Sequence, residues 1–281
     1  MLLVLAERAS QLAAKFPRHQ ISWKPDLLIP IDDPRIWSGS LLLIRSIAYP
    51  AGSIFAFTVK NAAIEETESA LKDLLAPLQD QHIPVNSTIL EDDDFLHGAK
   101  LVIQTLKGGT LRPNTLFLTL GESTENDVVI DELVGHAVRH EMGVMILNQN
   151  RRTAFGMQKY VNLWIRDRSP NWHLAMLIAL QIQLNWKGRL NLITVASEEG
   201  EIKRLYRFLE RLGDQVRLPS LSDFHVLSGP FPGVLETAPR ADINIFGLAK
   251  DLSFPFMRNA PELTKSSCLY IGDSGQESAL V

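Results

Sequence analysis

Two loops of the sequence carry residue types that can bind a nucleotide. Asp32 follows an apolar run at 25–31, and an aspartate in that place can hold an adenine or a ribose. Gly121 and Ser123 open the loop after a second apolar run, at 115–120, where the phosphates would lie. Three residues of this loop are acidic and would repel a phosphate: Glu122, Glu125 and Asp127.

A phosphate cradle needs several glycines, because only then do backbone N–H groups approach the anion closely. The loop at 121–127 has Gly121 alone. We therefore expect no cofactor and no tight binding of an adenine nucleotide. A soluble nucleotide-binding protein remains the main alternative.

Two histidines four residues apart, His136 and His140, share one face of an expected helix and could clasp a metal ion. Counted at 100° per residue from Ile130, both fall on the polar flank of that helix. The apolar face holds Leu133, Val134, Ala137 and Val138. No cysteine or third histidine lies nearby, so we expect solvated surface histidines and no metal site.

Signatures of common enzymes are missing from the sequence: it has no G-x-S-x-G, no P-loop and no G-x-G-x-x-G. Cys268, at the start of an expected strand, is interpreted as a small buried residue and not as a nucleophile. The acidic run at 91–94 precedes an expected helix, where negative charge favours the helix dipole. We expect no catalytic residues and no enzyme, with an unrecognised α/β enzyme as the weakest alternative.

The elements that position these residues alternate between apolar runs of strand length and segments of helical periodicity. The first half is expected to have strands at 25–31, 53–59, 85–90, 115–120 and 144–147. After a polar linker at 148–159, further strands are expected at 160–166, 190–196, 224–228, 242–248 and 268–273. Intervening helices predict parallel sheets covered on both faces. Only one full helix, at 253–263, fits among the last three strands.

The predicted organisation is an amphipathic helix over 1–22, a first α/β subdomain over 23–150 and a shortened second one over 151–281. Each subdomain is expected to be a Rossmann-like, mainly parallel sheet of about five strands covered by helices.

Composition excludes several classes of protein. The 281 residues carry a formal charge of −4 and a pI near 6.0, so no nucleic-acid partner is expected. The single cysteine excludes an internal disulfide framework. No segment reaches the ~18 to 20 uninterrupted apolar residues that span a bilayer, so we expect this chain to be soluble.

The helix expected at 172–184 is apolar nearly all round, whereas a helix that covers one face of a sheet needs only an apolar stripe. Its outer face must be covered by the other half, a second copy of the chain or a partner domain. We expect a two-fold homodimer, with four candidate contact residues: Trp172, Met176, Leu180 and Gln183.

The order of segments from about Trp23 to the C-terminus resembles the C-terminal cytoplasmic domain of cation-chloride cotransporters. WKPDLLIPIDDP (23–34) is similar to that domain's opening W-R-P-x-x-L-x-x-x-x-x-P, with Lys24 in place of arginine. GAKLVIQTLKGGTLRPNTLFLTL (98–120) resembles the stretch in which a helix, a glycine and L-x-P-N-T lead into a buried strand. This stretch is the most specific match.

Later segments continue the resemblance. HEMGVMILNQN (140–150) is similar to the end of the family's first half, with departures at Glu141 and Asn148. The segment at 160–196 resembles a tryptophan-leucine strand followed by an apolar helix, and ADINIFGLAKDL and CLYIGDSGQESALV resemble the closing strands. Gly272, Asp273 and Ser274 stand where the family has a different turn.

The resemblance implies a regulatory, non-catalytic domain of two universal-stress-protein-like halves, attached to a transmembrane domain that moves chloride with sodium or potassium. It also implies homodimerisation on the cytoplasmic side of the membrane and, in some relatives, an adenine nucleotide on the first half. The segment at 1–22 corresponds in position to the connecting helix. The family's transport residues lie in membrane helices, so none is assigned here. A stand-alone universal-stress-like protein that binds an adenine nucleotide is the alternative.

Overall fold

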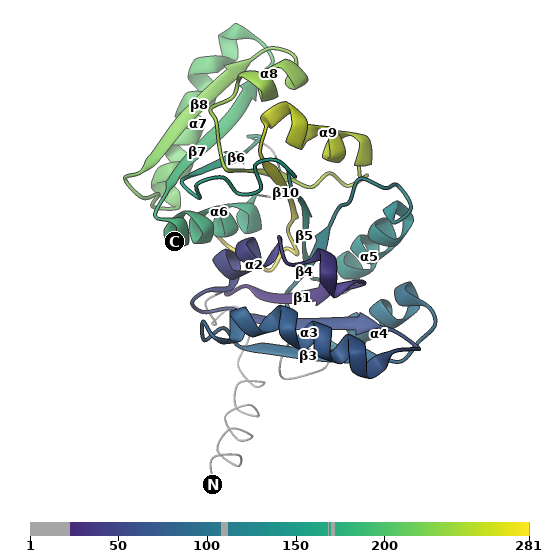
Figure 1. Cartoon of the computed structure of the whole chain (residues 1–281). Coiled ribbons are helices and arrows are strands. Elements are labelled where there is room, and N and C mark those ends of the chain that lie inside the picture. The colour runs from purple at the N-terminus through teal and green to yellow at the C-terminus, as the bar shows by residue number, and fades with distance from the viewer. Residues whose placement is uncertain (1–22, 108–111, 168, 170–171, 281) are drawn as a thin grey trace.

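The computed structural model describes residues 23–107, 112–167, 169 and 172–280. The helix expected at 1–22 and the glycine pair at 108–109 lie outside the described residues. Strands and helices alternate along the described chain and form two halves, one above the other in Figure 1. No helix of this described part combines the length and the apolar character that crossing a membrane requires.

The ten strands of the described residues belong to one sheet, in the order β3-β2-β1-β4-β5-β10-β9-β6-β7-β8. The first half contains β1 (Asp26–Pro30), β2 (Ser53–Val59), β3 (Val85–Leu90), β4 (Thr115–Thr119) and β5 (Gly143–Asn148). The second contains β6 (Tyr160–Trp164), β7 (Arg189–Ala196), β8 (Ser222–Ser228), β9 (Ile243–Gly247) and β10 (Ser267–Gly272). Each half thus repeats one strand order, 3-2-1-4-5 in its own numbering.

The two halves meet through β5 and β10, which pair antiparallel from Val144 opposite Gly272 to Asn148 opposite Cys268. Every other strand pair in the described sheet is parallel. An antiparallel junction between two parallel halves relates them by an approximate two-fold axis. The predicted fold class is confirmed, with the two five-stranded sheets joined into one.

Helices cover both faces of this sheet, as its buried strands require. The first half has η2 (Pro34–Ile36), α2 (Leu41–Ala48), α3 (Ile64–Gln79), α4 (Phe95–Lys107) and α5 (Asp127–Arg139). The second has α6 (His173–Trp186), η3 (Glu199–Glu201), α7 (Ile202–Gln215), α8 (Phe231–Thr237) and α9 (Phe254–Thr264). The acidic run lies directly before α4, as expected, and its last residue caps the helix. Asp94 Oδ1 accepts from the N–H groups of Leu96 and His97 at 2.8 and 3.1 Å.

Each face has its own hydrophobic core, and each core contains residues of both halves. One lies under α2, α3, α6 and α7, and the other under α4, α5, α8 and α9. The first and second halves therefore share their cores as well as their sheet.

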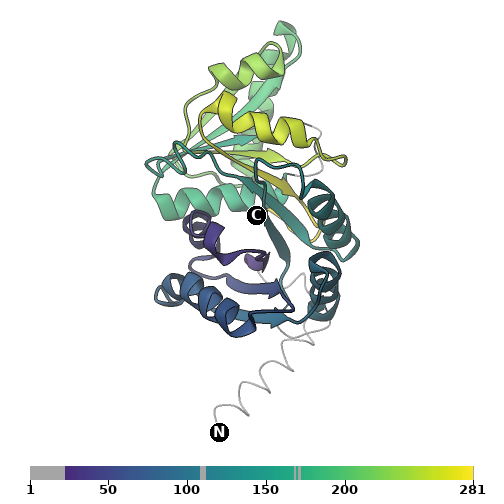
Figure 2. The same ribbon diagram turned by 45° about the vertical axis from the view of Figure 1, so that its right-hand side comes forward.

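The partner of the all-round apolar helix α6 is α2 of the first half. The two helices lie side by side in Figures 1 and 2. Trp186 Nε1 donates to Ser46 Oγ at 2.9 Å, and Asn185 Nδ2 donates to the carbonyls of Ser46 and Tyr49 at 2.7 and 2.8 Å. The first half of the chain therefore covers much of the α6 face for which the sequence indicated no definite partner.

This packing corrects the expected outer side of α6. Met176 is completely buried within the single chain, and Gln183 is 6% exposed with its amide donating to Gly188 O at 3.0 Å. Trp172 and Leu180 are partly buried. The face that stays open carries Leu177, Leu180 and Leu184, of which Leu184 is 64% exposed.

Candidate functional site

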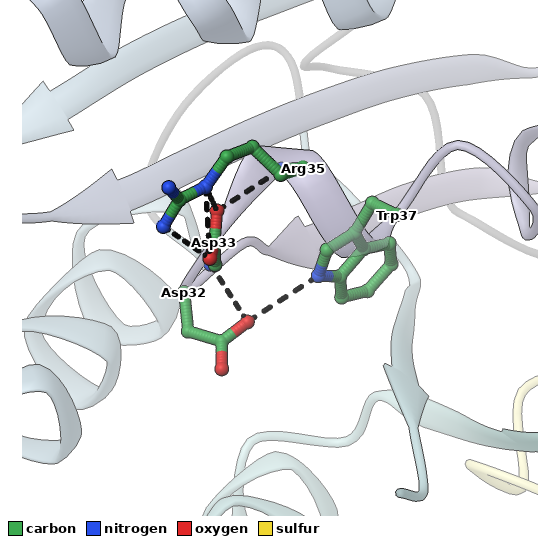
Figure 3. Close-up of polar contacts among 4 residues, drawn as sticks. All are labelled: Asp32, Asp33, Arg35 and Trp37. Carbon is green, nitrogen blue, oxygen red and sulfur yellow. Dashed lines mark hydrogen bonds and ion pairs between the residues drawn. The ribbon is translucent and has the colours of Figure 1, made fainter.

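The turn after β1 satisfies its own polar groups. Asp32 Oδ1 accepts from the backbone N–H of Asp33 at 2.9 Å and from Trp37 Nε1 at 3.4 Å (Figure 3). Asp33 Oδ1 accepts from the N–H and Nε of Arg35 at 3.1 and 2.9 Å, and these hydrogen bonds lower the pKa of the Asp33 carboxyl. Both carboxylates that follow β1 are thus bound within the turn from Asp32 to Trp37.

The loop after β4, at the same edge of the sheet, is held by Arg258 of α9. Arg258 Nε donates to Gly121 O at 3.1 Å and Nη2 donates to Ser123 O at 2.7 Å. Its Nη1 donates to Asp127 Oδ2 at 2.9 Å, and the bond to Asp127 raises the pKa of the guanidinium. Ser123 Oγ accepts from Glu125 N–H at 3.2 Å. The loop thus presents carbonyl and carboxylate oxygens to the Arg258 guanidinium. A phosphate cradle presents N–H groups instead.

Replacing Arg258 by methionine is expected to lower the free energy of unfolding by about 2–4 kcal/mol, because Asp127 and two carbonyls lose a partly buried partner. The urea midpoint measures this loss. The matched control is Arg151→Met, which removes an ion pair to Glu122 at 3.0 Å between two mostly exposed side chains. That change is expected to cost under about 1 kcal/mol. Equal midpoints for the two variants would contradict the assigned role of Arg258.

At the opposite edge of the sheet, Asn114 explains the P-N-T motif. Asn114 Oδ1 accepts from Asp26 N–H at 3.2 Å, and its Nδ2 donates to Lys24 O at 2.7 Å. The side chain therefore fixes the chain entering β1 against the chain entering β4. The motif has a structural role at the amino ends of these strands.

Asp242 lies directly before β9, as Asn114 lies directly before β4, and it binds the linker between the two halves. Its carboxylate accepts from the N–H groups of Met157, Lys159 and Tyr160 at 3.1, 2.6 and 3.0 Å. Every second residue of this linker has a left-handed backbone conformation with positive φ: Ala154, Gly156 and Gln158. Such alternation turns successive N–H groups toward one anion, here the Asp242 carboxylate.

The expectation of two solvated histidines is wrong for His136. It is 6% exposed, because α5 packs against α4 on that side, and its Nε2 has no hydrogen-bond partner. His140 lies beside it, with 4.5 Å between ring centroids. Within the described residues, no group of three or more His, Cys, Asp or Glu side chains is arranged to hold a metal.

Cys268 is completely buried, as predicted. Burial raises the pKa of its thiol to about 12. The thiol therefore stays protonated at neutral pH, which is the opposite of what a nucleophilic cysteine needs.

Two clefts lie at equivalent places at the amino ends of the strands. The first, of about 290 Å³, lies where α4 and α5 end and includes Trp23, His140 and Glu277 in its lining. The second, of about 470 Å³, lies where α8 and α9 end. Trp23 Nε1 and Glu277 Oε1 are buried without partners, whereas no such atom of the described residues belongs to the second cleft.

The two halves repeat one α/β unit within a single sheet. No recognisable catalytic constellation occurs in the described residues. These features define a class of α/β proteins built by tandem repetition. Two family models match this chain: the first C-terminal domain of prokaryotic cation-chloride cotransporters over residues 29–155, and the second over 156–280. The chain belongs to this family, of which it forms the C-terminal cytoplasmic domain.

A solved structure supports the assignment. The crystal structure of the cytoplasmic domain of a prokaryotic cation chloride cotransporter is 30% identical, with a TM-score of 0.83, over 92% of this chain and 98% of that one. A universal stress protein from Archaeoglobus fulgidus is 12% identical, with a TM-score of 0.58, over 90% and 98% of the two chains. A functionally unknown protein from Pseudomonas aeruginosa is 14% identical, with a TM-score of 0.59, over 90% and 94%. The last two show likeness of fold alone. The search of curated proteins returned no match.

Proposed function

We propose that this domain regulates a transporter that moves chloride with sodium or potassium. It also brings two copies of that transporter together, and it catalyses no reaction itself. The observation that carries the proposal is the family match across both halves. Since the domain is the cytoplasmic part, its partner is the transmembrane domain of the same transporter, on the inner side of the membrane. Its influence on transport must therefore pass through contacts between the two domains.

Chloride uptake into vesicles tests the regulatory role. The complete transporter and a version without this domain are reconstituted at equal density. A regulatory domain is expected to change the uptake rate several-fold while transport itself persists. An unchanged rate in the truncated version contradicts the role, provided that both proteins insert equally.

The dimer contact that we propose lies on the open face of α6 and the neighbouring surface of α2. Of the four residues expected from the sequence, Leu180 and Trp172 stay in this proposal, whereas Met176 and Gln183 are already covered by the chain. Leu184 extends the α6 stripe by one turn. On α2, Leu42 is 37% exposed, and Tyr49 just after it is 46% exposed. Exposed apolar side chains gathered on two neighbouring helices commonly mark a contact between subunits.

Tight nucleotide binding is not expected, since the oxygens of Gly121 and Ser123 bind Arg258 where phosphate would need N–H donors. Calorimetric titration of the chain with ATP measures this. A dissociation constant of about 10 µM or tighter, weakened by Asp32→Asn, would favour the alternative of a stand-alone nucleotide binder.

A further inference from the structure

His136 lies in the contact between α4 and α5, on a face that the sequence assigns to solvent. Its imidazole is 6% exposed, and Nε2 has no hydrogen-bond partner. Buried polar atoms without a partner are uncommon in folded proteins and call for a physical explanation. The proposed pairing and regulation of the transporter make no use of this group.

Most charged groups around His136 are basic. Arg139 Nη2 lies 3.5 Å from His136 Nδ1, and the ring of His140 is 4.5 Å away between centroids. Lys100 reaches toward α5 from α4, and its Nζ lies 2.8 Å from the carboxylate of Glu132, the acidic group of this cluster. A proton on His136 would thus add positive charge to a site that holds three basic side chains and one acid.

Burial, together with the positive charges of His140, Arg139 and Lys100, lowers the pKa of His136 below its usual value, and the Lys100 backbone opposes this shift only in part. When α4 and α5 separate, the imidazole meets water and regains the ordinary pKa of about 6.5. The open form then binds a proton that the packed form disfavours. Proton uptake therefore accompanies opening, and a fall in pH through this range shifts the equilibrium toward the open form.

We propose that His136 is a proton-operated switch that loosens the packing of α4 against α5 in mildly acidic conditions. Both helices end beside the first cleft, where Lys107, His140 and Trp23 lie. A loosened contact between α4 and α5 would therefore change the packing around the first cleft, which Trp23 lines near the start of the described residues. This inference goes beyond the proposed function and does not depend on dimerisation.

NMR titration of the unmodified chain tests the first step. The His136 ring is expected to titrate below the ordinary imidazole pKa of about 6.5. The His136→Gln spectrum assigns its signal. A His136 ring in the unmodified chain that titrates at or above about pH 6.5 overturns the proposal.

Hydrogen exchange at pH 7.5 and 5.5, corrected for intrinsic rates, tests the second step. Exchange in α4 and α5 is expected to rise by at least about threefold more than in α7 on acidification. His136→Gln should remove this excess, whereas the matched variant His82→Gln should keep it. An excess that persists in His136→Gln, or equal changes in all three helices, overturns the proposal.

Discussion

Met176→Glu is expected to unfold the chain instead of separating two copies of it. Met176 is completely buried in α6, in the hydrophobic core that contains residues of both halves. No basic group of the described residues forms an ion pair in this core, so the new carboxylate would be buried without a counter-ion. The cost is several kcal/mol, comparable with a typical total stability of about 5–15 kcal/mol. Circular dichroism during thermal unfolding measures the loss.

Leu184→Glu is the matched control, since it places the same charge two turns further along α6. Leu184 is 64% exposed, so the variant is expected to stay folded and to lose no more stability than pairing of two copies supplies, far less than Met176→Glu loses. If Met176→Glu melted like Leu184→Glu, Met176 would not be buried in the way described.

Gly156→Ala is expected to be the second most damaging change, lowering the free energy of unfolding by about 3 kcal/mol or more. Gly156 has a φ of +47°, and left-handed backbone costs other residues about 1–2 kcal/mol. A Cβ would also stand 2.1 Å from Asp242 Oδ1. The carboxylate would have to move away from the linker N–H groups, each of which would lose a charge-assisted hydrogen bond. Urea unfolding measures the effect.

Gly135→Ala is the matched control for that change. Gly135 lies inside α5, and a Cβ there meets no atom within 4 Å. Alanine favours helix over glycine by about 0.8–1.0 kcal/mol, so this variant should be as stable as the parent or more so. A Gly156→Ala protein with the parent's midpoint would show that the linker is not held by Asp242.

Much of the fold was predictable because buried parallel strands leave continuous apolar runs in the sequence, as Leu27 to Ile29 do in β1. The short helix α8 was missed, since its seven residues include Pro232 and Gly233, which mask helical periodicity. His136 was misplaced because the helical wheel shows one apolar face and cannot show that α4 covers a second side of α5.

The contacts of the candidate site were harder to predict, because they join residues that are distant in sequence. Arg258 and Asp127 are 131 positions apart, and nothing local to either residue indicates the other. The P-N-T motif was visible in the sequence, but the clamp formed by Asn114 depends on the neighbouring positions of β1 and β4. The acidic character of the loop at 121–127 is consistent with a basic partner such as Arg258, which binds Asp127. The poor phosphate binding that the same loop predicts stays a prediction.

Analytical ultracentrifugation tests the pairing role most directly. The parent chain is expected to sediment as a dimer at micromolar concentration, and Leu184→Glu as a folded monomer. Leu221→Glu, at a leucine that is 44% exposed beside β8, should remain a dimer. A parent that stays monomeric at high micromolar concentration, or a Leu184→Glu variant as dimeric as Leu221→Glu, would contradict the proposed contact.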